Sequence, residues 1–337
     1  MHIFKNTNFD FLRWRWHAIA MSWVLIIAGA VMFAKVGIPL GIEFAGGTEV
    51  IEQFDQPVSV DQVRSALDKG LGGNAGQNAI VQSFGDPSRH EVMIRVPSVL
   101  AESGEQLSSV ANGVDEALRK ANIGTFARQG AQIVGPAVGA ELKSRALLAT
   151  IFSLAGLLVY IAFRFQFSFA VGAVVATIHD LLITLAFLTF FRYDMTLNVI
   201  AAILTITGFS TNDTIVIFDR IRENLRSMRR DSLNHVINVS VNQTLGRTVI
   251  TSGTAFLTAI ALFVFGGEVL KGFAFTMIVG IVTGTYSSVF IAAATVSFWR
   301  GSAPTRAAAH APGGSALPQQ PQQPARKAKP QKKARAS

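Results

Sequence analysis

The sequence has 337 residues, of which 50% are hydrophobic and only 15% are charged, whereas about 25% of the residues in an ordinary soluble domain are charged. This composition argues against a purely soluble protein. Cysteine is absent, which excludes disulfide scaffolds, thiol catalysis and cysteine-ligated zinc or iron–sulfur centres. The sequence also lacks a Walker-type phosphate loop, so energy for any work is expected from a partner or from an ion gradient.

The net charge of +9 is concentrated at the carboxy-terminus. Residues 300–337 contain eight Lys or Arg residues and no Asp or Glu, so the rest of the chain is close to neutral. This placement argues against specific nucleic-acid binding. The segment is rich in Ala, Pro, Gln, Gly, Lys and Arg and cannot bury a core, which predicts a disordered basic tail. Contact with anionic lipid is its favoured role, and contact with ribosomal RNA or another acidic partner is the alternative.

Six stretches are apolar and long enough to cross a bilayer, which takes about 20 helical residues. They cover residues 18–36, 146–163, 169–190, 197–218, 249–265 and 273–299. The first follows a basic arm, residues 1–17, and so resembles a signal peptide. Its apolar run exceeds the usual length of about 7 to 15 residues, which favours an uncleaved membrane anchor.

Lys and Arg residues in the short connections predict the orientation of the spans, because cytoplasmic loops are enriched in both. They are concentrated in the arm, in the connection 219–246 and in the tail, which all fall on one side of six spans. The opposite side receives residues 37–142, with thirteen acids against seven bases. The pattern predicts that both termini are cytoplasmic and that the long segment lies outside.

Residues 37–142 show the alternating pattern of a small α+β domain inserted between the first two spans. Strands are predicted at 48–54, 79–84, 91–96 and 125–134, and helices at 59–69, capped by Ser59, and at 106–122. The order is βαββαβ, which is the ferredoxin-like split unit. The expected fold is therefore a polytopic α-helical membrane protein with six transmembrane helices and one inserted ferredoxin-like domain.

An ionisable residue inside the membrane costs at least a few kcal/mol and is a functional hypothesis by default. Asp213 lies about 24 Å inward from the outer end of the fourth span, and Arg247 lies about 27 Å inward, next to the fifth. Two roles are open for this pair. It is either a static ion pair that fixes helix register or, as we favour, a titrating pair that couples proton entry to conformational change.

The third span contains His179 and Asp180, with Asp180 near the bilayer midplane. Adjacent helical residues point about 100° apart and cannot both face one partner, so helix packing and proton transfer are balanced alternatives, with Asp180 the better candidate to titrate. Ser210, Asn212 and Thr214 make the fourth span unusually polar and are expected to support Asp213.

Two further patterns favour structural roles. Small residues recur every four positions at 272, 276, 280, 284 and 288, which predicts a face for close helix packing, with a pathway wall as the alternative. Residues 219–230 interleave Arg with apolar side chains, which suits a helix at the inner membrane interface.

Two motifs resemble the SecF branch of the SecD/SecF family of bacterial protein-export membrane proteins. Residues 41–48 read Gly-Ile-Glu-Phe-Ala-Gly-Gly-Thr, similar to the family signature Gly-[Ile/Leu]-Asp-Phe-x-Gly-Gly-Thr, and residues 208–224 match the most diagnostic family segment. Residues 179–180 and 243–254 also match, so the resemblance covers residues 1 to about 300. The motif positions of interest are Gly41, Glu43, Gly46, Gly47, Asp219, Arg220, Arg222 and Glu223. Glu43 stands where the family has Asp, and its longer side chain makes a turn or cap formed by this carboxylate uncertain.

The resemblance implies membership of the resistance–nodulation–division superfamily and a place in the bacterial inner membrane, with the inserted domain in the periplasm. It implies a non-enzymatic subunit, without a cofactor or metal, that forms a heterodimer with SecD. It also implies action beside the SecYEG channel and the SecA motor, often with YajC, where the proton-motive force assists late translocation and release of preproteins. By position, Asp213 and Arg247 match the family's membrane-embedded proton-pathway residues, with a further Asp supplied by SecD.

Two other functions fit the composition. One is half of a proton-driven exporter of small molecules or lipids in the same superfamily. The other is a membrane-anchored periplasmic chaperone, which would leave the polar residues of the fourth span unexplained. Sodium as the coupling ion is not excluded, because residues 210–213 are rich in oxygen ligands.

Overall fold

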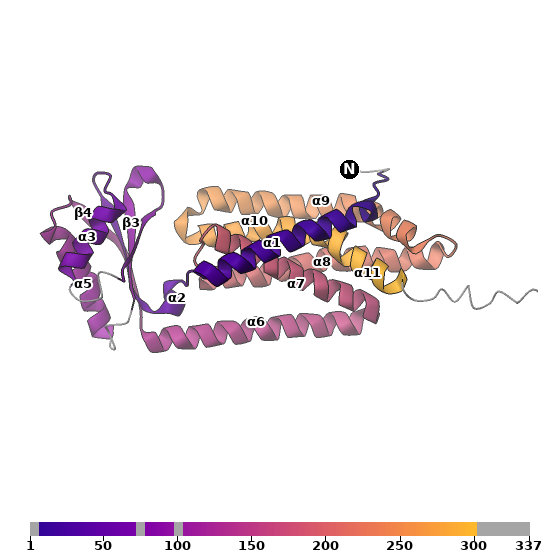
Figure 1. Ribbon diagram of the computed structural model, residues 1–337, viewed down its shortest axis with the longest axis horizontal. Coiled ribbons are helices and arrows are strands. Elements are labelled where there is room, and N and C mark those ends of the chain that lie inside the picture. The colour runs from indigo at the N-terminus through magenta and orange to yellow at the C-terminus, as the bar shows by residue number, and fades with distance from the viewer. Residues whose placement is uncertain (1–6, 72–77, 98–103, 302–337) are drawn as a thin grey trace, which may run out of the picture. The chain divides into compact units, whose positions relative to one another are not determined.

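The computed structural model describes residues 7–71, 78–97 and 104–301 (Figure 1). Its described part contains six helical spans that are long and apolar enough to cross a membrane, as the sequence predicts. The chain is therefore a multi-pass membrane protein. The spans are α1 (Arg15–Val36), α6 (Pro136–Arg164), α7 (Phe167–Phe190), α8 (Leu197–Ser227), α9 (Leu233–Phe265) and a sixth made of α10 (Gly267–Ser287), the π-helical η4 (Ser288–Ala292) and α11 (Ala293–Gly301).

Three helices extend well beyond the apolar stretches that mark them in the sequence. Helix α6 begins ahead of residue 146, α8 continues beyond 218, and α9 begins ahead of 249. Hydropathy locates only the part of a helix that matches hydrocarbon, whereas backbone hydrogen bonding continues into polar sequence. Residues 219–227 accordingly continue α8 instead of forming a separate interface helix, and only Met228–Ser232 connect α8 to α9.

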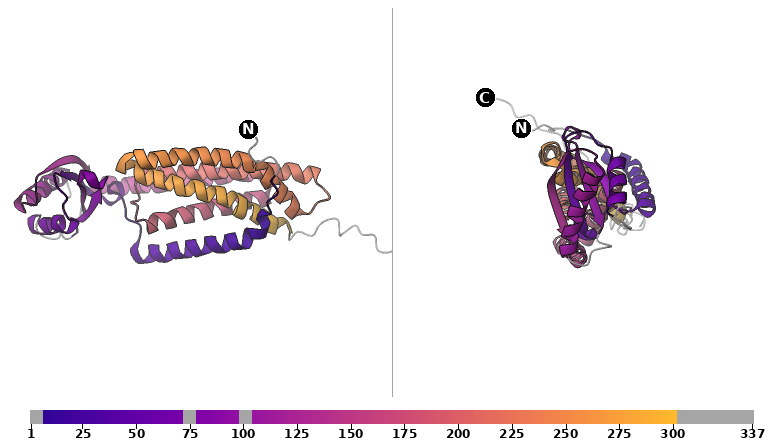
Figure 2. Two further views of the ribbon diagram at one scale, coloured as in Figure 1. Left: turned by 90° about the horizontal axis from the view of Figure 1, so that it is seen from above. Right: turned by 90° about the vertical axis from the view of Figure 1, so that its left-hand side faces the viewer.

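The bundle has three central and three peripheral spans. The apolar windows of α7, α8 and the sixth span are 56%, 50% and 61% buried within the protein, whereas those of α1 and α6 are each 11% buried. Figure 1 and the view from above in Figure 2 show α1 and α6 running along the outside of the bundle. Their apolar side chains are thus left to lipid or to a partner protein.

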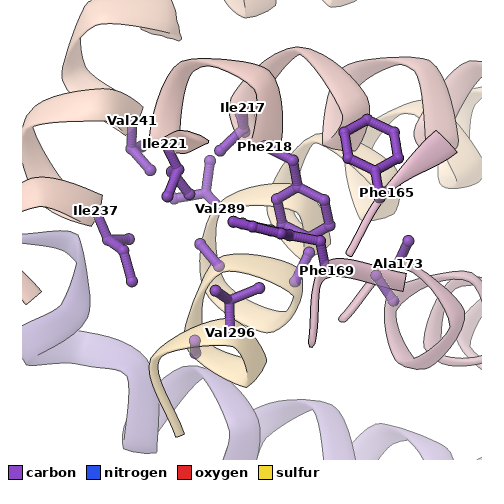
Figure 3. Close-up of a cluster of buried hydrophobic side chains, with 14 of the residues drawn as sticks. Phe165, Phe169, Ala173, Ile217, Phe218, Ile221, Ile237, Val241, Val289 and Val296 are labelled. Atoms are coloured by element: carbon purple, nitrogen blue, oxygen red, sulfur yellow. The ribbon is translucent and has the colours of Figure 1, made fainter. Parts of the chain in front are cut away.

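Two kinds of contact hold the central spans together. At one end, Phe165, Phe169 and Phe218 pack with Ile, Val and Ala side chains from α8, α9, η4 and α11 (Figure 3). Along the α8–α10 seam, a Cβ on Gly280 would lie 2.2 Å from the Cδ1 of Ile206, and one on Gly284 would lie 2.7 Å from the Cβ of Ser210. The predicted packing face of small residues is therefore confirmed, and α8 is its partner.

The amino-terminal arm is fastened to α9. Asp10 caps the short 3-10 helix η1 (Phe11–Trp14) and accepts a hydrogen bond of 2.7 Å from Asn238. Asn242 accepts from the backbone amide of Phe9 at 3.0 Å and donates to the carbonyl of the same residue at 2.9 Å. The start of α1 is thereby fixed by residues more than two hundred positions further along the chain.

The inserted domain is an antiparallel four-stranded sheet in the order β2-β3-β1-β4. The strands are β1 (Gly47–Phe54), β2 (Ile80–Phe84), β3 (Glu91–Pro97) and β4 (Phe126–Val134), and the helices are α3 (Val60–Gly70) and α5 (Gly104–Lys120). The βαββαβ order and the ferredoxin-like topology are confirmed. Inward residues of the strands, among them Val50, Phe54 and Ile94, are buried, and Phe54 and Ile94 pack with α3 and α5 in one core.

Helix α3 begins with the predicted cap. The side chain of Ser59 accepts from the amide of Gln62 at 3.2 Å, and the side chain of Gln62 accepts from the amide of Ser59 at 3.3 Å, which is a capping box. The four-residue helix α2 (Ile42–Ala45), which links α1 to β1, was not predicted.

The opposite face of the sheet meets the turn between α7 and α8 through one buried arginine. Arg95 of β3 is 5% exposed and lies 2.8 Å from both Glu49 and Asp194, and it donates to the carbonyl of Leu40 at 3.1 Å. These two carboxylates hold the pKa of Arg95 above its ordinary value despite burial. The domain and the α7–α8 turn of the bundle therefore share a charged, hydrogen-bonded joint.

Candidate functional site

Asp213 lies on the buried side of α8 and is 9% exposed. Its Oδ1 accepts a hydrogen bond of 2.6 Å from Thr248 of α9, and its Oδ2 accepts one of 2.8 Å from Ser288 at the start of η4. The carboxylate thus joins three spans. The bond to Thr248, next to Arg247, agrees with the depths predicted for the two sites.

The expected ion pair between Asp213 and Arg247 is not formed, since no salt bridge joins them among the described residues. Arg247 is exposed, whereas its neighbour Thr248 is 2% exposed and faces α8. A step of one residue turns a side chain by about 100° around a helix, so only one of these two can face Asp213. Direct contact between these two side chains, which both predicted roles of the pair assume, is therefore not present in this structure.

Asp180 forms a second buried carboxylate site, 5% exposed, in α7. Its Oδ2 accepts from Ser210 at 2.5 Å and from Ser287 at 2.8 Å, and its Oδ1 lies 2.9 Å from the Nδ1 of His179. The Nε2 of His179 lies 2.8 Å from the Oγ of Ser22 in α1. His179 and Asp180 thus contact each other, while their other partners differ, as the angle between them requires.

Five polar residues of this network were not predicted as site residues. The hydroxyl of Ser22 lies 3.3 Å from that of Tyr286, which donates to the carbonyl of Ala18 at 2.6 Å. The sequence did contain signals for three of these residues: one serine lies within the apolar run of the first span, and two consecutive serines lie in the sixth. The five residues are Ser22, Thr248, Tyr286, Ser287 and Ser288.

The three predicted supporting residues of α8 have different environments. Ser210 joins the network through Asp180, and Thr214 is 2% exposed. Asn212 is exposed and lies outside the network. Helices α8 and α9 run in opposite directions. The residues that precede two facing residues, one on each helix, therefore point to the same side of the helix pair. Asn212 and Arg247, which precede the bonded residues Asp213 and Thr248, therefore lie on one outward side of α8 and α9.

The residues of the first motif build the connection between α1, α2 and the sheet. The amide of Gly41 donates to the carbonyl of Met195 at 2.8 Å, and a Cβ at Gly41 would lie 2.8 Å from the Cγ2 of Thr196. Gly46 and Gly47 have φ values of +69° and +130°, which favour glycine. Glu43 lies in the first turn of α2, and its Oε2 is buried without a hydrogen-bond partner among the described residues.

The second motif ends in a polar cluster at the far end of α8. Arg220 donates to Gln243 of α9 and to Glu223, both at 2.6 Å, and Asp219 lies 3.9 Å from Arg164 of α6. The Nε of Arg222 is buried and has no hydrogen-bond partner among the described residues. This cluster joins the ends of α6, α8 and α9 rather than extending the carboxylate network.

The network places two carboxylates, one imidazole and several hydroxyls in the interior of a membrane bundle. Such groups exchange protons and reorient hydrogen bonds without covalent chemistry. In the part of the chain that the structure describes, no three His, Cys, Asp or Glu side chains are grouped so as to hold a metal ion.

Comparison with known proteins identifies the family of the chain. The family model for protein export membrane protein SecD/SecF, C-terminal, matches residues 114–302, more than half of the chain. The chain belongs to the SecF branch of the SecD/SecF family of protein-export membrane proteins. It is 39% identical to the protein translocase subunit SecF of Escherichia coli O157:H7, over 85% of this chain and 86% of that protein. It is 41% identical to the SecF subunit of Magnetococcus marinus, over 88% and 94%.

Solved structures of SecDF resemble the chain as well. The crystal structure of SecDF, a translocon-associated membrane protein from Thermus thermophilus, matches with a TM-score of 0.77 and 33% identity, covering 89% of this chain. SecDF in its super-membrane-facing form matches with a TM-score of 0.64 and 32% identity. The chain spans 40% of the length of each of those SecDF chains. Membership of the family supports a role in protein export.

Proposed function

We propose that the chain is the SecF subunit of an accessory complex of the Sec translocase, in which it pairs with SecD in the inner membrane. The complex uses the proton-motive force to assist late translocation and periplasmic release of preproteins that SecA drives through SecYEG, with YajC as a further partner. Support comes from the two buried carboxylates, from the family match and from the SecDF structures, in which a matching region makes up only part of a longer chain.

The outward side of α8 and α9 is the proposed surface for SecD. Exposed residues recur there with helical spacing and are small or polar, which permits close approach of another helix. They are Ala201, Thr205, Gly208 and Asn212 of α8, and Arg247, Thr251, Thr254 and Thr258 of α9. An unpaired guanidinium facing lipid is costly, so Arg247 requires an acid from the partner, which the family resemblance assigns to SecD.

Asp213 is the proposed proton carrier. In its ionised form it accepts hydrogen bonds from Thr248 and Ser288. A proton arriving at this carboxylate removes its charge and makes one of its two oxygens a donor, which weakens its hold on α9 and on the sixth span. Driving one elementary charge across 100 mV releases about 2.3 kcal/mol, enough to shift two conformations that lie close in energy.

The proposed orientation places both termini in the cytoplasm and the ferredoxin-like domain in the periplasm. It rests on the basic residues of the arm, the 219–246 segment and the tail, of which residues 1–6 and 302–337 lie outside the described part. The predicted disorder of the tail falls on the same undescribed residues.

The test compares export into membrane vesicles with and without an uncoupler, for the chain assembled with SecD. We expect Asp213→Asn and Arg247→Met to assemble yet lose the stimulation by the proton gradient, while SecA-driven translocation continues. The matched control is Asp231→Asn, an exposed acid in the connection between α8 and α9 and outside both motifs, which should keep the stimulation. Full uncoupler-sensitive stimulation in Asp213→Asn would refute Asp213 as the carrier, and stimulation that follows an imposed sodium gradient would identify sodium as the ion.

A further inference from the structure

Two consecutive serines connect the two carboxylates of the bundle. Ser287 donates to the Oδ2 of Asp180 and Ser288 donates to the Oδ2 of Asp213, each at 2.8 Å. Both serines are fully buried. One short segment of the sixth span therefore contacts both carboxylates, which belong to α7 and α8.

Each of these serines also has a second acceptor in its own helix. The Oγ of Ser287 lies 3.2 Å from the carbonyl of Gly284, and the Oγ of Ser288 lies 3.0 Å from the carbonyl of Thr285. A hydroxyl has one proton to donate and lone pairs with which to accept. Facing an ionised carboxylate it donates across to the neighbouring helix, and facing a protonated one it accepts and turns its own proton to its own helix.

The backbone changes at the same two positions. Helix α10 ends at Ser287 and the π-helical segment η4 begins at Ser288. Single-turn π segments inside α-helices are rare and occur often at functional sites. Because the serines are adjacent on this junction, a shift of the backbone at one serine displaces the other.

We propose that Ser287 and Ser288 are positioning residues that couple the protonation of Asp180 to that of Asp213. When a proton binds Asp213, Ser288 turns to Thr285, the junction shifts, and Ser287 changes its bond to Asp180. No covalent bond is made or broken other than that of the arriving proton, which stays on the carboxylate. The coupling rests on the proposed function, in which Asp213 carries the proton.

Other titratable or charged groups near Asp180 and Asp213 also influence the protonation of these two carboxylates. Among the described residues they are His179, which contacts Asp180, Tyr286, which reaches His179 through Ser22, and Arg247, which precedes the Asp213 partner Thr248. All three are retained in the variants below, so a difference between variants reports on the serines.

The experiment measures carboxyl protonation by infrared difference spectroscopy over a pH series, using the full chain with SecD in lipid vesicles. Asp180→Asn and Asp213→Asn assign the two carboxyl bands. We expect Asp213→Asn to move the pH midpoint of Asp180 by about 1 pH unit when both serines are present. In Ser287→Ala/Ser288→Ala the same replacement should move it by less than half as much.

Ser240→Ala is the matched control. Ser240 is a buried hydroxyl of α9 that accepts from Asn224 at 2.9 Å and donates to the carbonyl of Val236 at 2.7 Å, and neither bond leads to Asp180 or Asp213. Coupling should be unchanged there. If the double alanine variant does not assemble, Ser288→Ala alone must remove the coupling, and Ser288→Thr, which keeps the hydroxyl, must restore it.

Two results would overturn the inference. Undiminished coupling in Ser287→Ala/Ser288→Ala would mean that the two carboxylates interact without these serines. No coupling in the unmodified protein would mean that Asp180 and Asp213 titrate independently. The proposed function fails separately, when Asp213→Asn keeps gradient-stimulated export whatever the spectra show.

Discussion

The sheet domain and the membrane bundle each bury a carboxylate, and they surround it differently. Glu52 of β1 points into the core of the domain and is 0% exposed, with neither oxygen hydrogen-bonded among the described residues. Its nearest cation is the Nε of Arg128, 3.6 Å from Oε1. Asp213, in contrast, accepts two hydroxyl hydrogen bonds.

The difference shows what each region can do with a proton. Burial, together with the neighbouring Asp115, raises the pKa of Glu52 to about 8, so this side chain is mostly neutral at neutral pH. The hydroxyls around Asp213 stabilise an ionised carboxylate and can also accept from a protonated one. The bundle can therefore accommodate both the ionised and the protonated form of Asp213, whereas the domain core favours the protonated form of Glu52.

The largest effect is expected at the seam that holds Asp213 in place. Gly280→Leu forces a side chain into Ile206, which lies 2.2 Å from the position of a Cβ, so the cost should be about 3 kcal/mol or more. Folded protein recovered in detergent should fall sharply. Gly253→Leu is the control, because nothing lies within 4 Å of a Cβ there. Equal recovery of the two variants would contradict the packing described for α8 and α10.

The joint between the two regions should show the next largest effect. Arg95→Met leaves Glu49 and Asp194 facing each other without their shared cation, at a cost of about 3 kcal/mol for the joint. Hydrogen exchange should accelerate at residues 40–47 and at the α7–α8 turn, while the bundle interior keeps its protection. Arg64→Met, which removes an exposed pair with Asp61, should change neither. Unchanged exchange in Arg95→Met would show that the joint does not hold the domain.

The pH dependence of the domain tests its buried acid. The pKa of Glu52 is about 8 in the folded protein and 4.5 ordinarily, so between these values the folded domain binds more protons than the unfolded chain. Its free energy of unfolding should therefore fall as the pH rises through this window. Glu52→Gln should flatten this dependence and raise stability at pH 8, measured as protection factors of β1 amides. The exposed Glu116→Gln should leave the slope unchanged.

The smallest effect is expected from the cap of α3. Ser59→Ala removes one half of the capping box and should destabilise the domain by about 1 kcal/mol. Chemical denaturation followed at the domain gives the value, with the exposed strand residue Ser83→Ala as the reference. A loss no larger than that of the reference would mean that packing against α5 alone holds the helix.

The sequence predicts the six spans and the order of the inserted domain, because apolar length and strand alternation are local signals. It predicts that Asp213 lies level with the start of the fifth apolar stretch, but it assigns Arg247 instead of Thr248 as the partner, since a one-residue step decides which side chain faces the neighbour. Glu52 was missed although its place between Val50 and Phe54 marks it as inward-facing. The serines of the sixth span could not be assigned to their carboxylates, because that requires the packing of α7, α8 and α10.

The attachment of the amino-terminal arm to α9 has a consequence for biogenesis. Helix α1 is synthesised before the other five spans described here, yet the amide of Phe9 bonds to Asn242, 233 residues further along the chain. Contacts of such sequence separation form late, after the intervening spans have been made and inserted. Ser22 of α1 gains its partner His179 earlier, once α7 has been made, whereas the arm ahead of α1 stays unattached until α9 follows. The earliest of these six spans to be synthesised is therefore among the last to have its amino-terminal end fixed in place.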